Sequence, residues 1–207
     1  MQSFPEGVRH IPAFLDAAMQ ETLARDIADV IAQAPLFVSR MPKTGAPMSV
    51  RMTNCGPLGW MSDQEKGYRY EPRHPETGMA WPPMPLMLRE AWERLARYPL
   101  PPEACLVNVY DAEARMGLHQ DRDETDFDAP ILSLSLGAAC RFRVGGTRRA
   151  DKSLSFILAG GDALVLEGPA RRAFHGVDRI YPSLLTPLPG ALGGLGARIN
   201  LTLRRVG

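Results

Sequence analysis

The sequence predicts a mainly β protein, a sandwich or barrel of short strands with an N-terminal part that packs on it or covers its mouth. The 207 residues include 19 glycines and 19 prolines, a share above the average of roughly 12%, which favours short strands joined by turns over a helix bundle. Strand-like runs follow one another after Pro102. Apolar residues make up 45% of the chain and charged residues 23%, so a packed core is expected and wholesale disorder is excluded.

Two helices are expected before residue 100. The segment 16–34 has apolar residues at spacings of three and four, with Asp16 placed to cap its first turn and Pro35 to end it. The segment 85–97 begins with a proline at its first helical position. Its apolar residues share one helix face: Leu88, Trp92 and Leu95.

The remaining elements are expected to be strands and loops. Residues 41–85 form an irregular stretch rich in Gly, Pro, Met and aromatic residues, with one strand-like piece at 48–53. The Gly-, Leu- and Pro-rich stretch 184–196 is expected to be a loop. Glycine-containing turns separate the predicted strands of the second half, which are residues 104–110, 131–136, 140–144, 154–158, 163–166, 173–177 and 198–204.

Charge and cysteine content exclude several classes of protein. The 24 basic and 23 acidic residues leave a net charge of +1, which provides no global attraction to nucleic acid but is compatible with a local basic groove. No apolar run approaches the ~20 residues that span a bilayer, and the N-terminus shows no secretory signal. A cytoplasmic protein without a membrane partner is therefore expected. The three cysteines form no CxxC pair, which argues against a zinc ribbon or a disulfide framework.

Three residues have the types and spacing of a metal site. His119 and Asp121 are two positions apart, so in an extended chain both side chains lie on the same side. His175 lies in a strand-like run further on. Two histidines and one carboxylate form the facial triad of non-haem Fe(II) oxygenases, which leaves coordination positions open for cosubstrate and oxygen. The alternative for each histidine is a buried imidazole that donates to a carbonyl.

The last predicted strand has one polar and one aliphatic face. Period two places its polar residues together, namely Arg198, Asn200, Thr202 and Arg204. In the strand 104–110, Leu106, Asn108 and Tyr110 likewise share a face. If these faces point into a barrel, an isolated charge there is costly, so two arginines suit a bound dicarboxylate. The alternative is that each polar face is solvated.

Five motifs follow one another in the second half of the chain. They are Cys105-Leu-Val-Asn-Val-Tyr110, Gly117-Leu-His-Gln-Asp121-Arg-Asp-Glu, Ala129-Pro-Ile-Leu-Ser-Leu-Ser-Leu-Gly137, Phe174-His-Gly176 and Arg198-Ile-Asn-Leu-Thr-Leu-Arg204. This ordered set resembles the AlkB family of Fe(II)/2-oxoglutarate-dependent dioxygenases, and its bacterial members most closely. Residues 48–56 and the pair Gly59-Trp60 resemble the nucleotide-recognition lid of that family. The resemblance covers roughly residues 35–205.

The resemblance implies a fold and a division of the chain. The family fold is a double-stranded β-helix, a jelly-roll barrel that holds iron at its mouth. By this resemblance, residues 1–100 are the N-terminal helices and the nucleotide-recognition lid, packed on a jelly-roll core of residues 101–207, with the whole chain forming one structural unit.

The resemblance also implies the ligands of the site. His119, Asp121 and His175 would hold Fe(II), and 2-oxoglutarate and O2 would be the cosubstrates. Arg198 would pair with the distal carboxylate of 2-oxoglutarate, and Arg204 would lie near its 1-carboxylate end. A guanidinium makes a bidentate pair with a carboxylate whose geometry a lysine does not reproduce. Three further side chains would supply hydrogen bonds: Asn108, Tyr110 and Asn200.

The family reaction is oxidative demethylation of N-alkylated nucleic-acid bases such as 1-methyladenine and 3-methylcytosine, a direct-reversal repair that releases formaldehyde, succinate and CO2. The resemblance thus implies single- or double-stranded DNA as partner, with RNA as a further candidate, and a monomer. Trp60 would stack on the flipped cationic base, and Asp123 would accept from its exocyclic amine. Three residues match family positions near the nucleotide's phosphates or backbone: Tyr68, Tyr70 and Arg149. The lid carries one extra residue shortly after Trp60.

Two other functions are compatible with parts of this pattern. A hydroxylase of a protein or small molecule would keep the same barrel and metal chemistry but would need neither Trp60 nor the lid of residues 41–85. A non-catalytic jelly-roll module that binds nucleic acid or a ligand would show no iron-dependent oxygen uptake. The alternative for Trp60 is packing in the core or lid, and the alternative for Asp123 and the arginines near Arg149 is a solvated loop.

Overall fold

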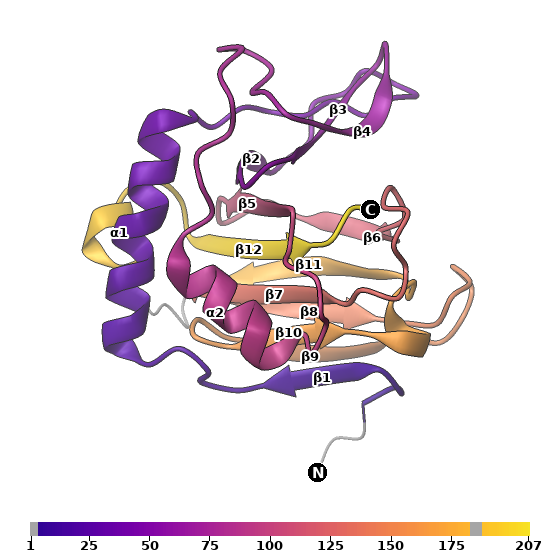
Figure 1. The fold of residues 1–207 in the computed structure, drawn as a ribbon. Coiled ribbons are helices and arrows are strands. Elements are labelled where there is room, and N and C mark those ends of the chain that lie inside the picture. Colours follow the sequence, from indigo (N-terminus) through magenta and orange to yellow (C-terminus); the bar gives the residue numbers. More distant parts are fainter. Residues whose placement is uncertain (1–3, 183–187) are drawn as a thin grey trace.

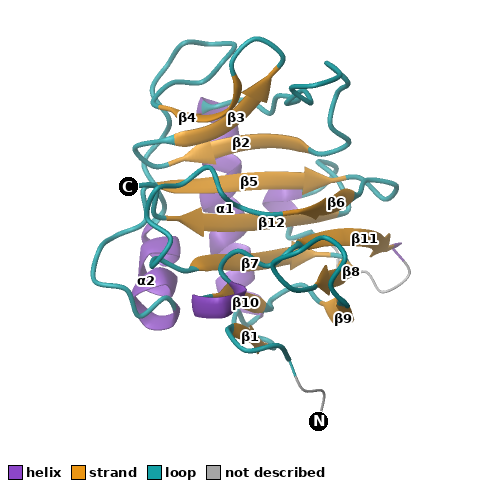
Figure 2. Cartoon of the chain, turned by 90° about the vertical axis from the view of Figure 1, so that its right-hand side faces the viewer, coloured by secondary structure: helices purple, strands orange, loops and turns teal. Residues whose placement is uncertain are grey.

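The computed structural model describes residues 4–182 and 188–207. Two β-sheets pack against each other through a shared apolar cluster, a separate hairpin lies above them, and two helices cover the outer face of the larger sheet (Figure 1). The turned view in Figure 2 shows the strands of the larger sheet stacked one above another, with the helices behind them. Every strand pair is antiparallel, and this mainly β jelly-roll architecture confirms the predicted fold class.

The two sheets differ in size. The larger contains, in spatial order, β1 (Val8–Ile11), β10 (Ala163–Leu166), β7 (Ile131–Gly137), β12 (Arg198–Arg204), β5 (Ala104–Tyr110) and β2 (Arg51–Cys55). The smaller contains β6 (Met116–His119), β11 (His175–Tyr181), β8 (Ala139–Val144) and β9 (Leu154–Leu158). The hairpin is β3 (Gly59–Asp63) with β4 (Gly67–Glu71), and the helices are α1 (Ala17–Gln33) and α2 (Leu86–Leu95), with 3₁₀ turns η1 (Gly168–Ala170) and η3 (Gly190–Leu192).

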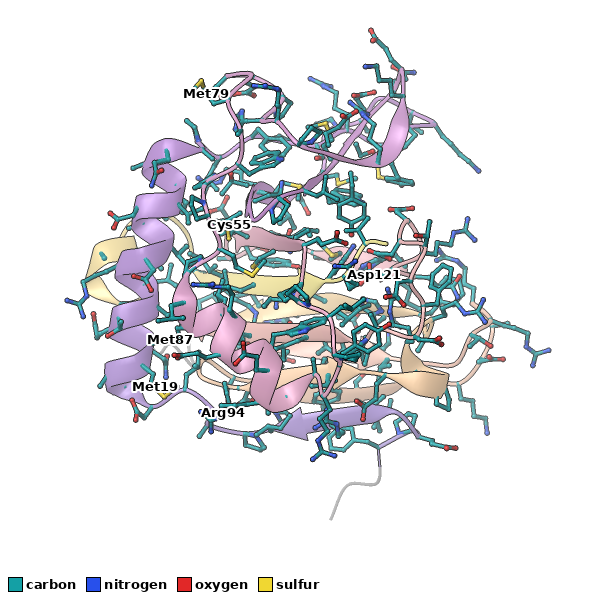
Figure 3. All side chains as sticks on the ribbon, viewed as in Figure 1. Met19, Cys55, Met79, Met87, Arg94 and Asp121 are labelled. Atoms are coloured by element: carbon teal, nitrogen blue, oxygen red, sulfur yellow. The ribbon has the colours of Figure 1, made fainter. Side chains whose placement is uncertain are left out.

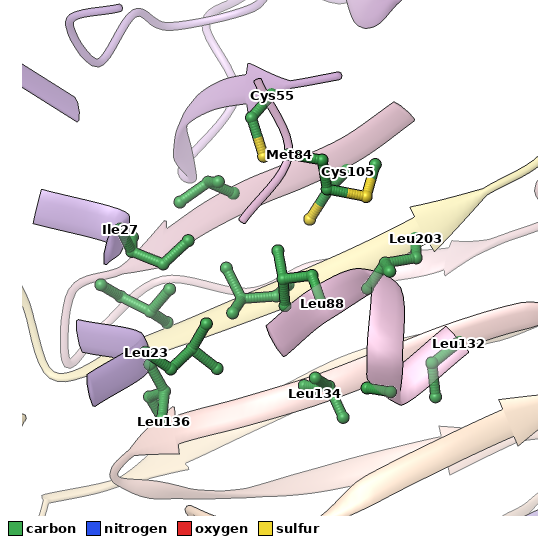
Figure 4. Close-up of a cluster of buried hydrophobic side chains, with 14 of the residues drawn as sticks. Leu23, Ile27, Cys55, Met84, Leu88, Cys105, Leu132, Leu134, Leu136 and Leu203 are labelled. Carbon is green, nitrogen blue, oxygen red and sulfur yellow. The ribbon is translucent and has the colours of Figure 1, made fainter. Parts of the chain in front are cut away.

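The central strand β12 separates the core from the site. Its aliphatic side chains lie on the outer face, in a fully buried cluster with residues of β5, β7 and both helices. Figure 4 shows this cluster, in which Leu23 and Ile27 of α1 and Leu88 of α2 lie over Leu134 and Leu203 of the sheet. Because successive side chains alternate, burying the aliphatic face under the helices turns the polar face toward the smaller sheet.

Both predicted helices are present. α1 begins after Asp16, whose carboxylate accepts from the amide of Met19 at 2.8 Å, and it ends one residue before Ala34. α2 is shorter than the predicted segment and begins after Pro85, which has an extended backbone and is its N-cap residue. No helix within the described residues is both long enough and apolar enough to cross a membrane.

The strands predicted in the second half agree with the structure to within one residue at each end, except at one place. The run predicted at 173–177 begins instead at His175, because the amide of Ala173 closes a turn onto the carbonyl of Ala170, and it continues to Tyr181. The strand predicted at 48–53 begins at Arg51. Residues 184–187 of the predicted loop 184–196 lie outside the described residues.

Four strands were not predicted from the sequence: β1, β3, β4 and β6. Each has four or five residues, and glycines lie in or beside all four, so their local pattern is weak. Pairing with a neighbour determines them: β1 pairs with β10 and β6 with β11. Since β1 and β2 belong to the same sheet as β5, the chain segments on the two sides of residue 100 share one sheet.

Candidate active site

A cavity of about 640 Å³ is lined by residues of both sheets and of the hairpin β3–β4. Its walls carry the polar face of β12 and β5, the ends of β6 and β11, and the lid. Asp121 lies on the side of the molecule away from α1 (Figure 3). Twelve of the thirteen residues predicted from the sequence line this cavity: Trp60, Tyr68, Asn108, Tyr110, His119, Asp121, Asp123, Arg149, His175, Arg198, Asn200 and Arg204.

Sheet pairing brings the two predicted histidine ligands together. His119 ends β6 and His175 begins β11, and the register pairs these two residues directly. Their ring centroids are 4.5 Å apart. Asp121 follows two residues after His119, and its Oδ1 and Oδ2 lie 3.5 Å from Nε2 of His119 and 3.4 Å from Nε2 of His175, respectively. One ligand atom from each residue lies within 4.8 Å of the other two, so the three can hold one ion.

Backbone carbonyls orient both imidazoles. Nδ1 of His119 lies 2.9 Å from the carbonyl of Gly117, and Nδ1 of His175 lies 3.0 Å from that of Ala173. A ring whose Nδ1–H donates in this way has its lone pair on Nε2. Nε2 is the nitrogen that faces Asp121 in both rings. These contacts therefore place three lone-pair donors around one point, as metal ligation requires.

Asp121 has the properties of an ionised ligand. Burial alone would raise its pKa, but the charge of Arg204 and the two histidines outweigh burial and hold the pKa of Asp121 well below its usual value. Its Oδ2 is buried and has no hydrogen-bond partner. A buried oxygen without a partner is costly unless a ligand satisfies it. The His-Asp-His donor set therefore fits Fe(II), with positions left open for a cosubstrate and oxygen.

Arg198 is a buried cation at the inner end of the cavity. It is 1% exposed, and within the described residues no carboxylate lies within ion-pairing distance of it. Nη1 donates to the carbonyls of Ala138 and Leu158 at 2.8 and 3.1 Å, and Nη2 to the hydroxyl of Ser135 at 2.6 Å. Its Nε has no partner. A buried charge in this situation requires an anion, which fits a carboxylate of the keto acid.

Three other polar side chains line the cavity on the same face of β5 and β12, namely Tyr110, Asn108 and Asn200. Burial raises the pKa of Tyr110, which keeps its hydroxyl protonated and able to donate. Asn200 already donates to the hydroxyl of Ser133 and accepts from that of Thr202. Asn108 lies opposite Asn200 on the neighbouring strand and on the same face.

The lid brings two predicted base contacts together. The indole Nε1 of Trp60 donates to Oδ2 of Asp123 at 2.8 Å, across the mouth of the cavity. Tyr68 stacks on Trp60, with ring centroids 5.7 Å apart and an interplanar angle of 22°. The register of the β3–β4 hairpin pairs Ser62 with Tyr68 and Trp60 with Tyr70.

Arg149 lines the cavity, whereas Tyr70 does not. The hydroxyl of Tyr70 contacts Glu124 and lies 3.0 Å from Nη1 of Arg204, inside the protein. The sequence predicted that Tyr70 contacts a phosphate of the nucleotide. In this structure its hydroxyl instead points to the buried carboxylate of Glu124. Arg149 is exposed at the cavity wall and donates to the carbonyl of Leu118 at 2.9 Å.

Two buried charged residues beside the site were not predicted. Glu124 and Arg171 are 3% and 2% exposed and form an ion pair at 3.3 Å. In the sequence Glu124 is one acid in a run of four among residues 121–126, a composition typical of a solvated loop. Ser133 and Ser135 were also missed, although the alternation of Ser and Leu in 131–137 is a signal for a strand with one polar face.

Comparison with known proteins agrees with this geometry. The family model described as the 2OG-Fe(II) oxygenase superfamily matches residues 7–204. An alpha-ketoglutarate-dependent dioxygenase AlkB homolog of Caulobacter vibrioides is 52% identical, covering 94% of this chain and 85% of that protein. The alpha-ketoglutarate-dependent dioxygenase AlkB of Escherichia coli is 41% identical over 90% of this chain and 85% of its own length.

More distant relatives match as well. The tRNA demethylase abh1 of Schizosaccharomyces pombe is 34% identical over half of this chain and 36% of its own length. A solved structure of OsALKBH1 superposes with a TM-score of 0.79 at 28% identity, covering 99% of this chain and all of that one. With its triad, its cavity-facing arginines and these matches, the chain belongs to the 2OG-Fe(II) oxygenase superfamily and, within it, to the AlkB family of Fe(II)- and 2-oxoglutarate-dependent dioxygenases.

Proposed function

We propose that this protein is an oxidative demethylase of N-alkylated bases in nucleic acids, of the 1-methyladenine and 3-methylcytosine type, and that it acts in direct-reversal repair. One observation carries the proposal: the His-Asp-His triad, the unpaired Arg198 and the Trp60–Asp123 pair open into the same cavity. A small keto acid does not require an aromatic and acidic mouth, whereas a cationic flipped base does.

Each side chain has a definite task in this proposal. His119, Asp121 and His175 hold Fe(II), which together with 2-oxoglutarate supplies the redox chemistry when bound. Arg198 binds the distal carboxylate of the keto acid, and Arg204 lies at the 1-carboxylate end. Asn108, Tyr110 and Asn200 line the same wall and orient the keto acid by hydrogen bonds. The apolar lining around them excludes water from the reacting methyl group.

Base recognition is assigned to the lid. The electron-rich face of Trp60 suits a methylated cationic ring. One carboxylate oxygen of Asp123 is held by the indole, and the other is available to accept from an exocyclic amine. Since these lesions do not pair normally, flipping one into the cavity costs less than flipping an undamaged base. The side chains of Tyr68 and Arg149 are exposed at the cavity wall, and we propose that they contact the phosphates beside the flipped nucleotide.

The name of one relative supports a nucleic-acid substrate, because the fission-yeast protein is a tRNA demethylase. We propose single- and double-stranded DNA as substrates, with RNA as a further one. The positive side chains at the cavity rim, namely Arg115, Arg122 and Arg149, would make binding depend on salt concentration.

The proposal is tested with a single-stranded oligonucleotide that carries 3-methylcytosine. The purified protein should release formaldehyde and form succinate only when Fe(II), 2-oxoglutarate and oxygen are all present. An unmethylated oligonucleotide of the same sequence is the control. Absence of formaldehyde from every methylated substrate, with continued consumption of 2-oxoglutarate, would favour a hydroxylase of a protein or small molecule. Absence of any iron-dependent oxygen uptake would favour a non-catalytic module.

Replacing Trp60 by alanine separates base binding from the chemistry of the keto acid. We expect kcat/KM on the methylated oligonucleotide to fall about 10- to 100-fold, since stacking on an aromatic ring is worth about 1–3 kcal/mol per base. Consumption of 2-oxoglutarate without substrate should continue, because within the described residues the side chain of Trp60 hydrogen-bonds to Asp123 and stacks on Tyr68 but forms no hydrogen bond or ring contact with the triad or Arg198. The variant Trp60→Phe keeps a ring and should recover most of the loss. Equal loss of both activities in Trp60→Ala would mean that the indole only supports the fold of the lid.

A further inference from the structure

Glu124 lies at the centre of a buried charged network beside the metal site. Its carboxylate contacts three side chains from three parts of the chain: the hydroxyl of Tyr70 on β4, Nη1 of Arg204 on β12 at 3.0 Å, and Nη2 of Arg171 at 3.3 Å. Glu124 is 3% exposed. A buried carboxylate is costly unless it is fully paired, and here two of the three partners, Tyr70 and Arg204, belong to strands that border the site.

Arg171 fixes the loop that carries Glu124. Besides the ion pair, its Nε donates to the carbonyl of Ala129 at 2.7 Å and its Nη1 to the carbonyl of Asp121 at 2.9 Å. The loop from Asp121 to Ala129 is therefore held at its start, at Glu124 and at its end by one side chain. Because Asp121 is also the carboxylate of the triad, the position of Glu124 is tied to that of the metal ligand.

Arg204 is held on two sides by carboxylates. Its Nη2 forms an ion pair with Oδ1 of Asp121 at 2.8 Å, and its Nη1 donates to Glu124 and to the hydroxyl of Tyr70, both at 3.0 Å. Its Nε is buried and has no partner. A planar guanidinium held at both terminal nitrogens has a single orientation, so Glu124 on one side and Asp121 on the other together determine where the Nε–H points.

The hydroxyl of Tyr70 closes the network from the lid. It donates to Glu124 and accepts from Arg204. Burial raises the pKa of Tyr70 well above its ordinary value, with a further contribution from Glu124, so the hydroxyl keeps its proton and can donate. Trp60 lies opposite Tyr70 in the β3–β4 pairing, so the same hairpin carries the proposed base-stacking ring and the link to Arg204.

We propose that Glu124 is a positioning residue for the keto-acid site, which holds Arg204 in its productive orientation, and that Tyr70 connects the nucleotide lid to this pair. This inference rests on the proposed role of Arg204 at the 1-carboxylate end of 2-oxoglutarate. It assigns to Tyr70 a task inside the protein in place of a contact with phosphate. Binding of 2-oxoglutarate would thereby affect the position of the lid, and the position of the lid would affect the affinity for 2-oxoglutarate.

The test compares Glu124→Gln and Tyr70→Phe with the unmodified protein. Glu124→Gln keeps the shape of the side chain but removes the charge, and we expect the affinity for 2-oxoglutarate to fall about tenfold, the loss typical of one charge-assisted hydrogen bond. The affinity is measured by calorimetry on the Mn(II)-loaded protein, which does not depend on turnover. In Fe(II) assays KM for 2-oxoglutarate should rise with a smaller change in kcat. Tyr70→Phe should show a smaller loss of affinity and faster proteolysis of the lid.

Glu167→Gln is the matched control. Glu167 pairs with Arg9 at 2.8 Å, outside the cavity, so this variant loses an ion pair and should keep its affinity for 2-oxoglutarate. A folded Glu124→Gln protein that binds 2-oxoglutarate within twofold of the unmodified protein would overturn the inference. If Glu124→Gln does not fold, unchanged 2-oxoglutarate affinity and unchanged lid proteolysis in Tyr70→Phe would overturn it. Failure of the unmodified protein to bind 2-oxoglutarate at all would instead overturn the proposed function.

Discussion

Replacing His119 by alanine is expected to abolish metal binding at the triad and, with it, release of formaldehyde and consumption of 2-oxoglutarate. His119 supplies one of the three donor atoms that the described part of the chain brings together at this point, and Asp121 and His175 alone cannot complete a facial set. Removing a side chain that hydrogen-bonds to a metal ligand already lowers metal affinity or activity about 10- to 100-fold. Removing the ligand itself should therefore lower both by more than that. Metal affinity is measured by anaerobic titration with Fe(II) or by Mn(II) binding.

His10→Gln is the matched control for that experiment. His10 lies on β1, where its ring contacts Asp162 at 2.8 Å and does not line the cavity. This variant should bind metal and turn over normally, with at most a lower Tm. Full turnover by His119→Ala would show that the assigned triad is wrong, since the reaction could then not depend on this imidazole.

The second large effect is expected at Arg198. Its guanidinium is buried, donates to two backbone carbonyls and to Ser135, and has no carboxylate partner within the described chain. Arg198→Lys keeps the charge but loses the planar fork that pairs with a carboxylate. Truncating one partner of a buried charged pair costs about 2–5 kcal/mol, so KM for 2-oxoglutarate should rise by roughly a hundredfold.

The measurement separates binding of the keto acid from chemistry. Succinate formation is followed as 2-oxoglutarate is varied at saturating substrate, and calorimetry on the Mn(II)-loaded protein reports the affinity directly. The control is Arg143→Lys, since Arg143 pairs with Asp178 at 3.2 Å and does not line the cavity. If Arg198→Lys binds 2-oxoglutarate as tightly as the unmodified protein, the distal carboxylate is held elsewhere.

The sequence predicted the elements whose pattern is local. The helix after Asp16 was predicted because its cap and its apolar spacing lie within one segment. The strand Arg198–Arg204 was predicted with its bounds because seven alternating residues determine both its length and its two faces. The short strands β1 and β6 were not predicted, because pairing with distant strands stabilises them, and their own residues carry little signal.

The same distinction applies to the site. Residue types and order led from the sequence to His119, Asp121 and His175 and to the arginines of the last strand, because ligand chemistry depends on which atoms a side chain carries. Only the tertiary structure decided that Tyr70 points inward and that Glu124 is buried between two arginines. An acid in a run of acids is expected in water, and it becomes a buried partner only when Arg171 and Arg204, 47 and 80 residues away, fold against it. Partners so far apart in the chain meet through the packing of sheets, which no local pattern encodes.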